Sequence, residues 1–207
     1  MILTWIGDVR PLLDESCYLR YREQVPVFRA EKADRLRSPA GRALSIGVWI
    51  LWQRAREECG LSPDTPFNLS HSGIYALCSV AAEDPAQVGC DVERISVFRE
   101  GIARRFFCPE EYAHIKARED PAKQRELFFR YWVLKESFMK ATRRGMALPL
   151  DSFALGIRDG ADPVLAFCPA PYRREDYHFR EFDLGGYRAA VCSTDPRIDT
   201  RLRWRIY

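Results

Sequence analysis

Lysine is scarce in this chain of 207 residues. Of its 32 Lys and Arg residues only five are lysine, and two of these, Lys135 and Lys140, lie in the short stretch 132–140. Long apolar runs are also missing, since none approaches the ~18 residues that indicate a membrane span. The N-terminus has no basic region followed by an apolar core. These absences argue against a membrane protein and against a signal peptide.

Paired cysteines are absent as well. The seven cysteines are an odd number and none forms a C-x-x-C pair. This usage predicts reduced, largely buried thiols in a cytoplasmic protein rather than a zinc site or a disulfide framework. The net charge of +3 is too small to indicate nucleic-acid binding. It is compatible with an anionic ligand or an acidic partner protein.

The predicted elements run strand, helix, strands, helices, strands, an order typical of an α+β protein. End signals and apolar spacing predict one helix from Ser38-Pro39 to Cys59-Gly60 and a long helix over 124–143. Strands are predicted over 4–9, 74–82, 87–95, 153–157, 164–167, 177–184 and 187–192. We expect strands 74–82 and 87–95 to pair in an antiparallel hairpin or meander.

Two carboxylates share one face of the predicted strand 87–95. Because side chains alternate along a strand, Asp91 and Glu93 lie on the side of Gly89, opposite Cys90 and Val92. Such a pair suits a hard divalent cation such as Mg²⁺. A solvent-exposed acidic face is the simpler interpretation, and alternation alone favours it.

The predicted helix 124–143 carries a second charged pair. Trp132, Glu136 and Lys140 recur every four residues, on a face beside the apolar stripe. A solvated Glu–Lys pair, worth only ~0.2–0.5 kcal/mol, is the simple interpretation. The aromatic ring on the same face argues against full solvation and favours a reaction centre. The apolar stripe itself consists of Leu127, Tyr131, Leu134 and Phe138.

Two further segments could bind an anion. The turn-like stretch 68–73 places Ser70 and His71 beside Gly73, and such a turn can bind an anion through side-chain and backbone donors. A lone His is more often structural, and no G-x-S-x-G motif supports a hydrolase. The second segment is a basic cluster that is either a solvated face or a clamp for phosphate or an acidic partner. It consists of Arg29, Lys32, Arg35, Arg37 and Arg42.

Taken together and in this order, these motifs resemble those of the 4′-phosphopantetheinyl transferases of the larger, surfactin-synthetase-activating (Sfp) type. The resemblance spans roughly residues 35–153. It rests on Asn68-Leu69-Ser70-His71-Ser72, Gly89-Cys90-Asp91-Val92-Glu93, Arg104-Arg105-Phe106-Phe107 with Glu111, Trp132-x-x-Lys135-Glu136-Ser137 with Lys140, and Leu148-Pro149-Leu150-Asp151-Ser152-Phe153.

This resemblance implies an α+β pseudo-dimer of two similar halves, each an antiparallel sheet packed with a long helix. We place the halves at residues 1–97 and 98–207. It also implies a monomeric enzyme that binds coenzyme A and Mg²⁺ between the halves, with Mn²⁺ as an alternative ion. The implied reaction moves the 4′-phosphopantetheine arm of coenzyme A to a serine of an apo acyl or peptidyl carrier protein and releases 3′,5′-ADP.

The resemblance also assigns roles to the catalytic and metal-binding residues. Asp91, Glu93 and Glu136 would hold the metal ion. Lys140 would contact the diphosphate of coenzyme A, and Glu136 is the candidate general base. Lys135 has no assignment beyond a phosphate or partner contact.

Substrate contacts are implied for the basic and turn segments. Ser70 and His71 would bind the 3′-phosphate of coenzyme A. Arg37 and Lys32 would contact its adenine-nucleotide end. The chain lacks the Gly-Lys-Pro segment that many members carry before the Asn-x-Ser-His motif, so an Arg of the basic cluster could substitute. The missing Lys also leaves an alternative, a catalytically weak module that binds coenzyme A or a carrier.

Overall fold

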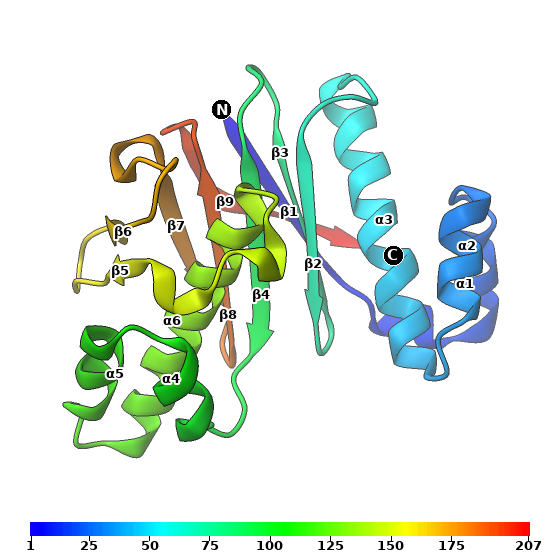
Figure 1. The fold of residues 1–207 in the computed structure, drawn as a ribbon. Coiled ribbons are helices and arrows are strands. Elements are labelled where there is room, and N and C mark those ends of the chain that lie inside the picture. Colours follow the sequence, from blue (N-terminus) through cyan, green and yellow to red (C-terminus); the bar gives the residue numbers. More distant parts are fainter.

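Apolar alternation sets the layers of the fold. The computed structural model describes residues 1–207, apart from the side chain of Met146. In strand β1 (Ile2–Asp8), Leu3 and Trp5 pack toward one side of the sheet, and Ile2 and Ile6 pack toward the other. A strand with both faces buried lies inside a layered structure. The layers are helix, sheet, sheet and helix (Figure 1).

The long helices form the outer layers. Helix α3 covers the first sheet, with α1 and α2 outside it, and α6 covers the second sheet (Figure 1). The helices are α1 (Glu15–Arg22), α2 (Val27–Asp34), α3 (Pro39–Cys59), α4 (Glu100–Phe106), α5 (Pro109–Lys116) and α6 (Pro121–Ala141). None of these described helices combines the length and the apolar character that a bilayer crossing requires.

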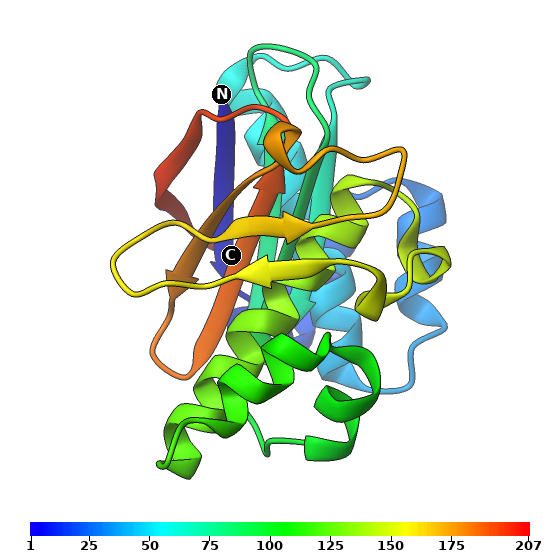
Figure 2. The same ribbon diagram turned by 60° about the vertical axis from the view of Figure 1, so that its left-hand side comes forward.

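The strands form two main sheets and one hairpin. The first sheet has the order β2-β3-β1-β9 and the second the order β4-β8-β7. The β5–β6 hairpin lies beside α6 on the outer side of the second sheet (Figure 2). The remaining strands are β2 (Phe67–Ser72), β3 (Tyr75–Ala81), β4 (Val88–Arg94), β5 (Ala154–Gly156), β6 (Val164–Phe167), β7 (His178–Asp183), β8 (Tyr187–Ser193) and β9 (Ile198–Ile206).

The predicted α+β class, with antiparallel sheets packed against long helices, is confirmed. One pairing departs from the antiparallel pattern, because β9 runs parallel to β1. The division at residues 97 and 98 stays a prediction. Each sheet takes a strand from across that division, since β4 joins the second sheet and β9 joins the first.

The predicted hairpin of strands 74–82 and 87–95 is wrong. Strand β3 pairs with β1 and β2, whereas β4 pairs with β8, about a hundred residues further along the chain. The pattern of turn residues between β3 and β4 is the same whether the two strands pair or belong to different sheets. Strands β2 and β9 were not predicted. The stretch 68–73, which was predicted to be turn-like, is wrong as a turn because residues 67–72 form strand β2 and pair with β3.

The ends of both long helices follow the expected chemistry. The Ser38 side chain accepts a hydrogen bond from the Gly41 backbone N–H at 3.0 Å, and Pro39 occupies the first helical position. Gly60 ends α3 in the left-handed region with φ of 61°. Helix α6 begins at Pro121, three residues before the predicted start, because Asp120 supplies the N-cap.

Gly89 sets how closely β4 approaches α6. A Cβ atom at this position would lie 2.1 Å from the Ser137 carbonyl oxygen and 2.3 Å from the Ala141 nitrogen. These are backbone atoms of α6 and cannot move aside as a flexible side chain can. The missing side chain therefore lets the strand and the helix present their charged residues to each other.

We predict that Gly89→Ala lowers the free energy of unfolding by about 3 kcal/mol or more, because the added methyl group must push α6 away from β4. Urea denaturation would measure the loss. Gly101→Ala is the matched control, since an added Cβ there meets no described atom within 4 Å. It should leave the stability unchanged or slightly raised. Equal effects of the two substitutions would contradict this account of the packing.

Candidate active site

A polar cavity of about 310 Å³ lies where β2, β4 and α6 meet. It gathers most of the residues that the sequence motifs singled out. The side chains that line it are Leu69, Ser70, His71, Asp91, Glu93, Trp132, Glu136 and Lys140. Lys32 and Arg37, both predicted to bind the ligand, do not line this cavity.

Side chains of strand β2 bind the backbone of strand β4 and hold the two strands side by side. The two strands are edges of different sheets, so they share no backbone ladder. Instead, alternate side chains of β2 accept hydrogen bonds from alternate backbone N–H groups of β4, which satisfies donors that an edge strand would otherwise leave unpaired. The pairs are Asn68 with Cys90 at 3.0 Å, Ser70 with Val92 at 3.3 Å, and Ser72 with Arg94 at 3.2 Å.

The hydroxyl groups of β2 also orient the carboxylates of β4. Ser70 donates to Asp91 at 2.8 Å, and Ser72 donates to Glu93 at 2.7 Å. Ser70 additionally accepts a hydrogen bond from Lys140 at 3.2 Å. With three partners inside the protein, the Ser70 hydroxyl supports Asp91 and Lys140 in this structure.

Lys140 crosses from α6 to β4 and pairs with Asp91. Its ammonium nitrogen lies 2.7 Å from Oδ1 of Asp91 and 3.1 Å from the carbonyl oxygen of Cys90. Burial raises the pKa of Asp91, and the ammonium group of Lys140 opposes that rise. Burial alone would lower the pKa of Lys140, but the Asp91 carboxylate raises it above its ordinary value. The alternative of a solvated Glu136–Lys140 pair on the helix surface is therefore not what the structure has, since Lys140 pairs with Asp91 of β4.

Two more carboxylates stand close to this pair. Partial burial raises the pKa of Glu93, and the negative charges of Asp91 and Glu136 raise it further. Partial burial likewise raises the pKa of Glu136, with Asp91 again adding to the rise. Three carboxylates thus share one lysine, which leaves an excess of negative charge in the cavity.

The donor set of the cavity fits a hard divalent cation. Oδ2 of Asp91 is buried and has no hydrogen-bond partner in the described structure, although a buried polar oxygen is normally satisfied. Carboxylate oxygens are the ligands that Mg²⁺ prefers, and it usually binds one or two of them together with water and phosphate oxygens. Among the described residues, no three Asp, Glu, His or Cys side chains form a ready-made cluster of ligands. The carboxylates therefore suit an ion that also takes oxygens from a substrate.

His71 marks the cationic end of the cavity. Its ring reaches the surface, but the surrounding protein partly desolvates it and lowers its pKa, and the charges of Arg29, Lys140 and Lys32 lower it further. A ring surrounded by cations is a favourable place for an anion.

Arg29 was part of the predicted basic cluster but was not chosen as a ligand contact. Its side chain is 9% exposed, its Nε donates to the Ser45 carbonyl at 2.9 Å, and its guanidinium stacks on Trp49. Arg37 is exposed in the segment before α3. Arg29 lies one helical turn before Ala33 and shares its buried face of α2, and this spacing was the signal that could have favoured Arg29.

Lys135 is buried and does not line the polar cavity. The prediction of a phosphate or partner contact is wrong, because the side chain is completely buried and pairs with Glu111 at 2.8 Å. Lys135 directly precedes Glu136 in the helix, so it projects about 100° away from the cavity.

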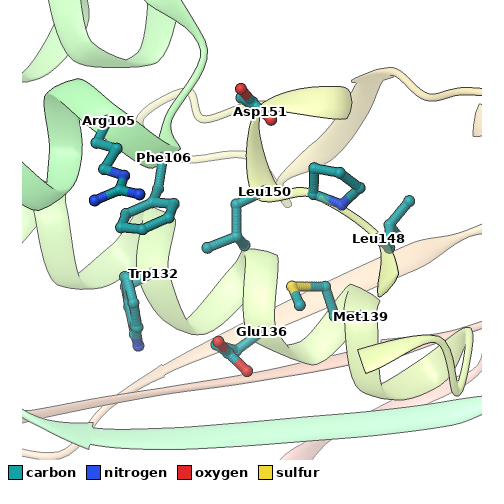
Figure 3. Close-up of a pocket in the computed structure, with 9 residues that line it drawn as sticks. Arg105, Phe106, Trp132, Glu136, Met139, Leu148, Leu150 and Asp151 are labelled. Carbon is teal, nitrogen blue, oxygen red and sulfur yellow. The ribbon is translucent and has the colours of Figure 1, made fainter. Parts of the chain in front are cut away.

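A second, largely apolar pocket of about 470 Å³ adjoins the polar cavity, and Trp132 and Glu136 line both. Figure 3 shows Trp132, Glu136 and Met139 on α6, with Leu148 and Leu150 on the segment facing them. The other lining residues are Arg105, Phe106, Pro149 and Asp151. Glu136 thus stands at the junction between a charged space and an uncharged one.

The chain belongs to the 4′-phosphopantetheinyl transferase superfamily, because residues 87–192, just over half of the protein, match the family model of that description. The matched region contains the carboxylates of β4, the whole of α6 and the segment that faces it. The family resemblance of the motifs is therefore confirmed.

Individual relatives agree with this assignment. A 4′-phosphopantetheinyl transferase of Bacillus subtilis is 34% identical over 146 residues, which cover 70% of this chain and 62% of the relative. The 4′-phosphopantetheinyl transferase Sfp of Bacillus subtilis strain 168 is 33% identical over 135 residues, 65% of this chain and 57% of the relative. The chain thus spans less than two thirds of the length of either protein.

Among solved structures, the Chronobacterium ammoniagenes ACPS–CoA complex is 18% identical to this chain, with a TM-score of 0.42. The match covers 53% of this chain and 96% of that one.

The excess negative charge predicts a pH-dependent gain in stability on neutralising Glu136. Its carboxyl group titrates at higher pH in the folded protein than its ordinary value of 4.5, so its stabilising contribution is present at low pH and is lost as the pH rises through the folded pKa. In metal-free protein at pH 7.5, Glu136→Gln should raise the melting temperature by a few °C. The gain should vanish near pH 4, where the native side chain is also protonated.

Thermal unfolding at the two pH values would measure this difference. Glu110→Gln is the control, since Glu110 is exposed on α5 and does not line the cavity. A stabilisation by Glu136→Gln that is equal at both pH values would contradict the electrostatic explanation.

Proposed function

We propose that this protein transfers the 4′-phosphopantetheine arm of coenzyme A to a serine of an apo acyl or peptidyl carrier protein and releases 3′,5′-ADP. One observation carries the proposal: a charged cavity and an apolar pocket share Trp132 and Glu136. Coenzyme A has the same division, with an anionic nucleotide end and an uncharged arm joined by a diphosphate. Superfamily membership and the names of the relatives support the same reaction.

The proposed substrate would lie across this junction. Its 3′-phosphate would face His71, with Arg29 and Lys32 supplying positive charge and Arg37 a more distant contact. Its diphosphate would lie beside Lys140, and its arm would enter the apolar pocket past Trp132. In this arrangement Arg29 substitutes for the lysine of the missing Gly-Lys-Pro segment.

Asp91, Glu93 and Glu136 are the residues that would hold Mg²⁺, with Mn²⁺ as an alternative. The unpartnered Oδ2 of Asp91 and the excess negative charge support this assignment. When bound, the ion would supply positive charge on the diphosphate oxygens. The protein's own part is to keep these carboxylates oriented, which Ser70 and Ser72 do through their hydroxyl groups.

The chemical step needs one proton acceptor and one stabilised leaving group. The carrier serine oxygen would form a bond to the β-phosphorus of coenzyme A, while the bond from that phosphorus to the bridging oxygen breaks. We assign the serine proton to Glu136, because a raised pKa makes a carboxylate a better base near neutral pH. Lys140 would stabilise the negative charge that gathers on the departing 3′,5′-ADP.

A catalytically weak module that binds coenzyme A or a carrier is the second candidate. It is favoured by the absence of a lysine in the loop 60–66 and by the engagement of Lys140 with Asp91. Calorimetric binding of coenzyme A without any transfer would support this candidate. We also infer a cytoplasmic monomer that binds no nucleic acid.

The decisive experiment is mass spectrometry of a panel of apo carriers incubated with coenzyme A, Mg²⁺ and this protein. A gain of one phosphopantetheine on the carrier serine would support the proposal and begin to define the partner. Unmodified carriers throughout the panel would count against it.

We predict that Asp91→Ala and Glu136→Ala each reduce the labelling rate by at least about a hundredfold, because each removes a proposed metal ligand and the latter also the base. Carrier labelling followed over time would measure this. Glu110→Ala, on the exposed side of α5, should label at the wild-type rate. Near-normal labelling by either cavity variant would refute the proposed site.

We predict that Arg29→Met and Lys32→Met each lower the affinity for coenzyme A by about tenfold, because a charge-assisted contact to the 3′-phosphate is lost. Arg37→Met should lower this affinity less. Calorimetry with coenzyme A and with 3′-dephospho-coenzyme A would separate this effect from a general loss of affinity. The affinity for 3′-dephospho-coenzyme A should change little. A similar loss of affinity for both ligands would mean that Arg29 and Lys32 do not contact the 3′-phosphate.

A further inference from the structure

The buried pair of Lys135 and Glu111 has no part in the proposed chemistry. The two side chains are 0% and 1% exposed, and they join α6 to α5 at a distance of 2.8 Å. Removing two charges from water is costly, and apolar residues of similar size often replace such pairs without loss of stability. The presence of the pair therefore calls for an explanation other than stability alone.

Three of the pair's five other hydrogen bonds go to the backbone of residues 150–155, and the remaining two go to Cys108. The Lys135 ammonium donates to the carbonyl oxygens of Leu150 at 2.7 Å and Phe153 at 2.6 Å. Glu111 accepts from the backbone N–H of Leu155 at 2.8 Å and from that of Cys108 at 3.0 Å. All three ammonium protons are used, so the lysine can hold this segment in only one position.

The Cys108 thiol adds two contacts to the same segment. Its sulfur lies 3.1 Å from the carbonyl oxygen of Phe153 and 3.4 Å from that of Asp151. The Lys135 ammonium also lies over the Phe153 ring, 4.4 Å from its centre. Residues 150–155 are thus held to α6 and to the start of α5 through the carbonyl oxygens of Leu150, Asp151 and Phe153 and the N–H of Leu155.

The fastened segment carries one wall of the apolar pocket. Leu148, Leu150 and Asp151 line that wall, and Glu136 and Met139 line the helix side (Figure 3). Lys135 is adjacent to Glu136 in the same helical turn, so a single helix sets the positions of both the carboxylate and the opposite wall. The Lys135 ammonium therefore holds the backbone of Leu150, a residue of the wall opposite Glu136.

We infer that Lys135 and Glu111 are positioning residues that fix the wall 148–151 at the distance needed to hold the uncharged arm of the substrate next to Glu136. The identity of that arm rests on the proposed function. Neither side chain touches substrate. Their effect passes through the backbone of residues 150–155, so they determine arm binding and leave the binding of the nucleotide end to the polar cavity.

The test compares coenzyme A with 3′,5′-ADP, which has the same nucleotide end but lacks the second phosphate of the diphosphate and the uncharged arm. Coenzyme A reaches both spaces, whereas 3′,5′-ADP can occupy only the polar cavity. In the variant Lys135→Met with Glu111→Gln, both charges are gone and the side-chain volumes are nearly kept. We expect its calorimetric affinity for coenzyme A to fall at least about tenfold, the effect of losing apolar contacts of this size. Its affinity for 3′,5′-ADP should stay within about twofold of the wild-type value.

Two comparisons separate positioning from folding. Lys135→Met alone leaves a buried, unpaired carboxylate and should lower the melting temperature by about 10 °C. The double variant should regain most of that loss without regaining affinity for coenzyme A. Arg130→Met is the matched control, because Arg130 is on the same helix but does not line the pocket. It pairs with Glu181 at a distance of 2.8 Å. This substitution should change neither affinity.

Equal weakening of both ligands in the double variant, or unchanged binding of coenzyme A, would overturn the inference. Wild-type protein that binds coenzyme A but transfers nothing would refute the proposed function and leave this inference standing. If the wild-type protein binds neither ligand, amide hydrogen exchange of residues 148–155 tests the positioning role instead. The amides of residues 148–155 should then exchange about tenfold faster in the double variant while those of α3 stay unchanged. Unchanged exchange would refute the positioning role.

Discussion

The fold depends on a contact between two sheet edges that is made by side chains. Strand β2 ends one sheet and β4 ends the other, and Asn68, Ser70 and Ser72 accept hydrogen bonds from the backbone of β4. Because these residues alternate along β2, they meet alternate N–H groups of β4, as a strand partner would. The same hydroxyl groups orient Asp91 and Glu93. The same side chains therefore join the two sheets and orient the carboxylates of the cavity.

Two faces of helix α6 have different roles, one toward β4 and the other toward α5. Toward β4 it presents Lys140 and Glu136 to the carboxylates, at a distance that Gly89 makes possible. Away from the cavity it presents Lys135 to Glu111. A lysine on the first side is part of the charged site, and a lysine on the second is part of the framework. Residues of one type and nearly adjacent in sequence thus differ in role because of what surrounds them.

Much of the fold and of the site was predictable from local pattern. Ser38, Pro39 and Gly60 marked the ends of α3, and strand alternation placed Asp91 and Glu93 on one face. The i, i+4 spacing of Glu136 and Lys140 indicated a common helix face. The partner of β4 was not predictable, because the turn between β3 and β4 is compatible with pairing or with separation. Strand β9 was missed, and Arg29 was passed over for Arg37.

The sequence by itself determined most of the helices and strands, which residues share a face, and the superfamily that these motifs resemble, because each of these depends on neighbours within a few residues. Tertiary structure alone decided that Lys140 pairs with Asp91, that Lys135 is buried against Glu111, and that Arg29 is near His71. Each of these outcomes joins residues far apart in the chain. Burial and charge at such contacts follow from packing of the layers, which no local pattern contains.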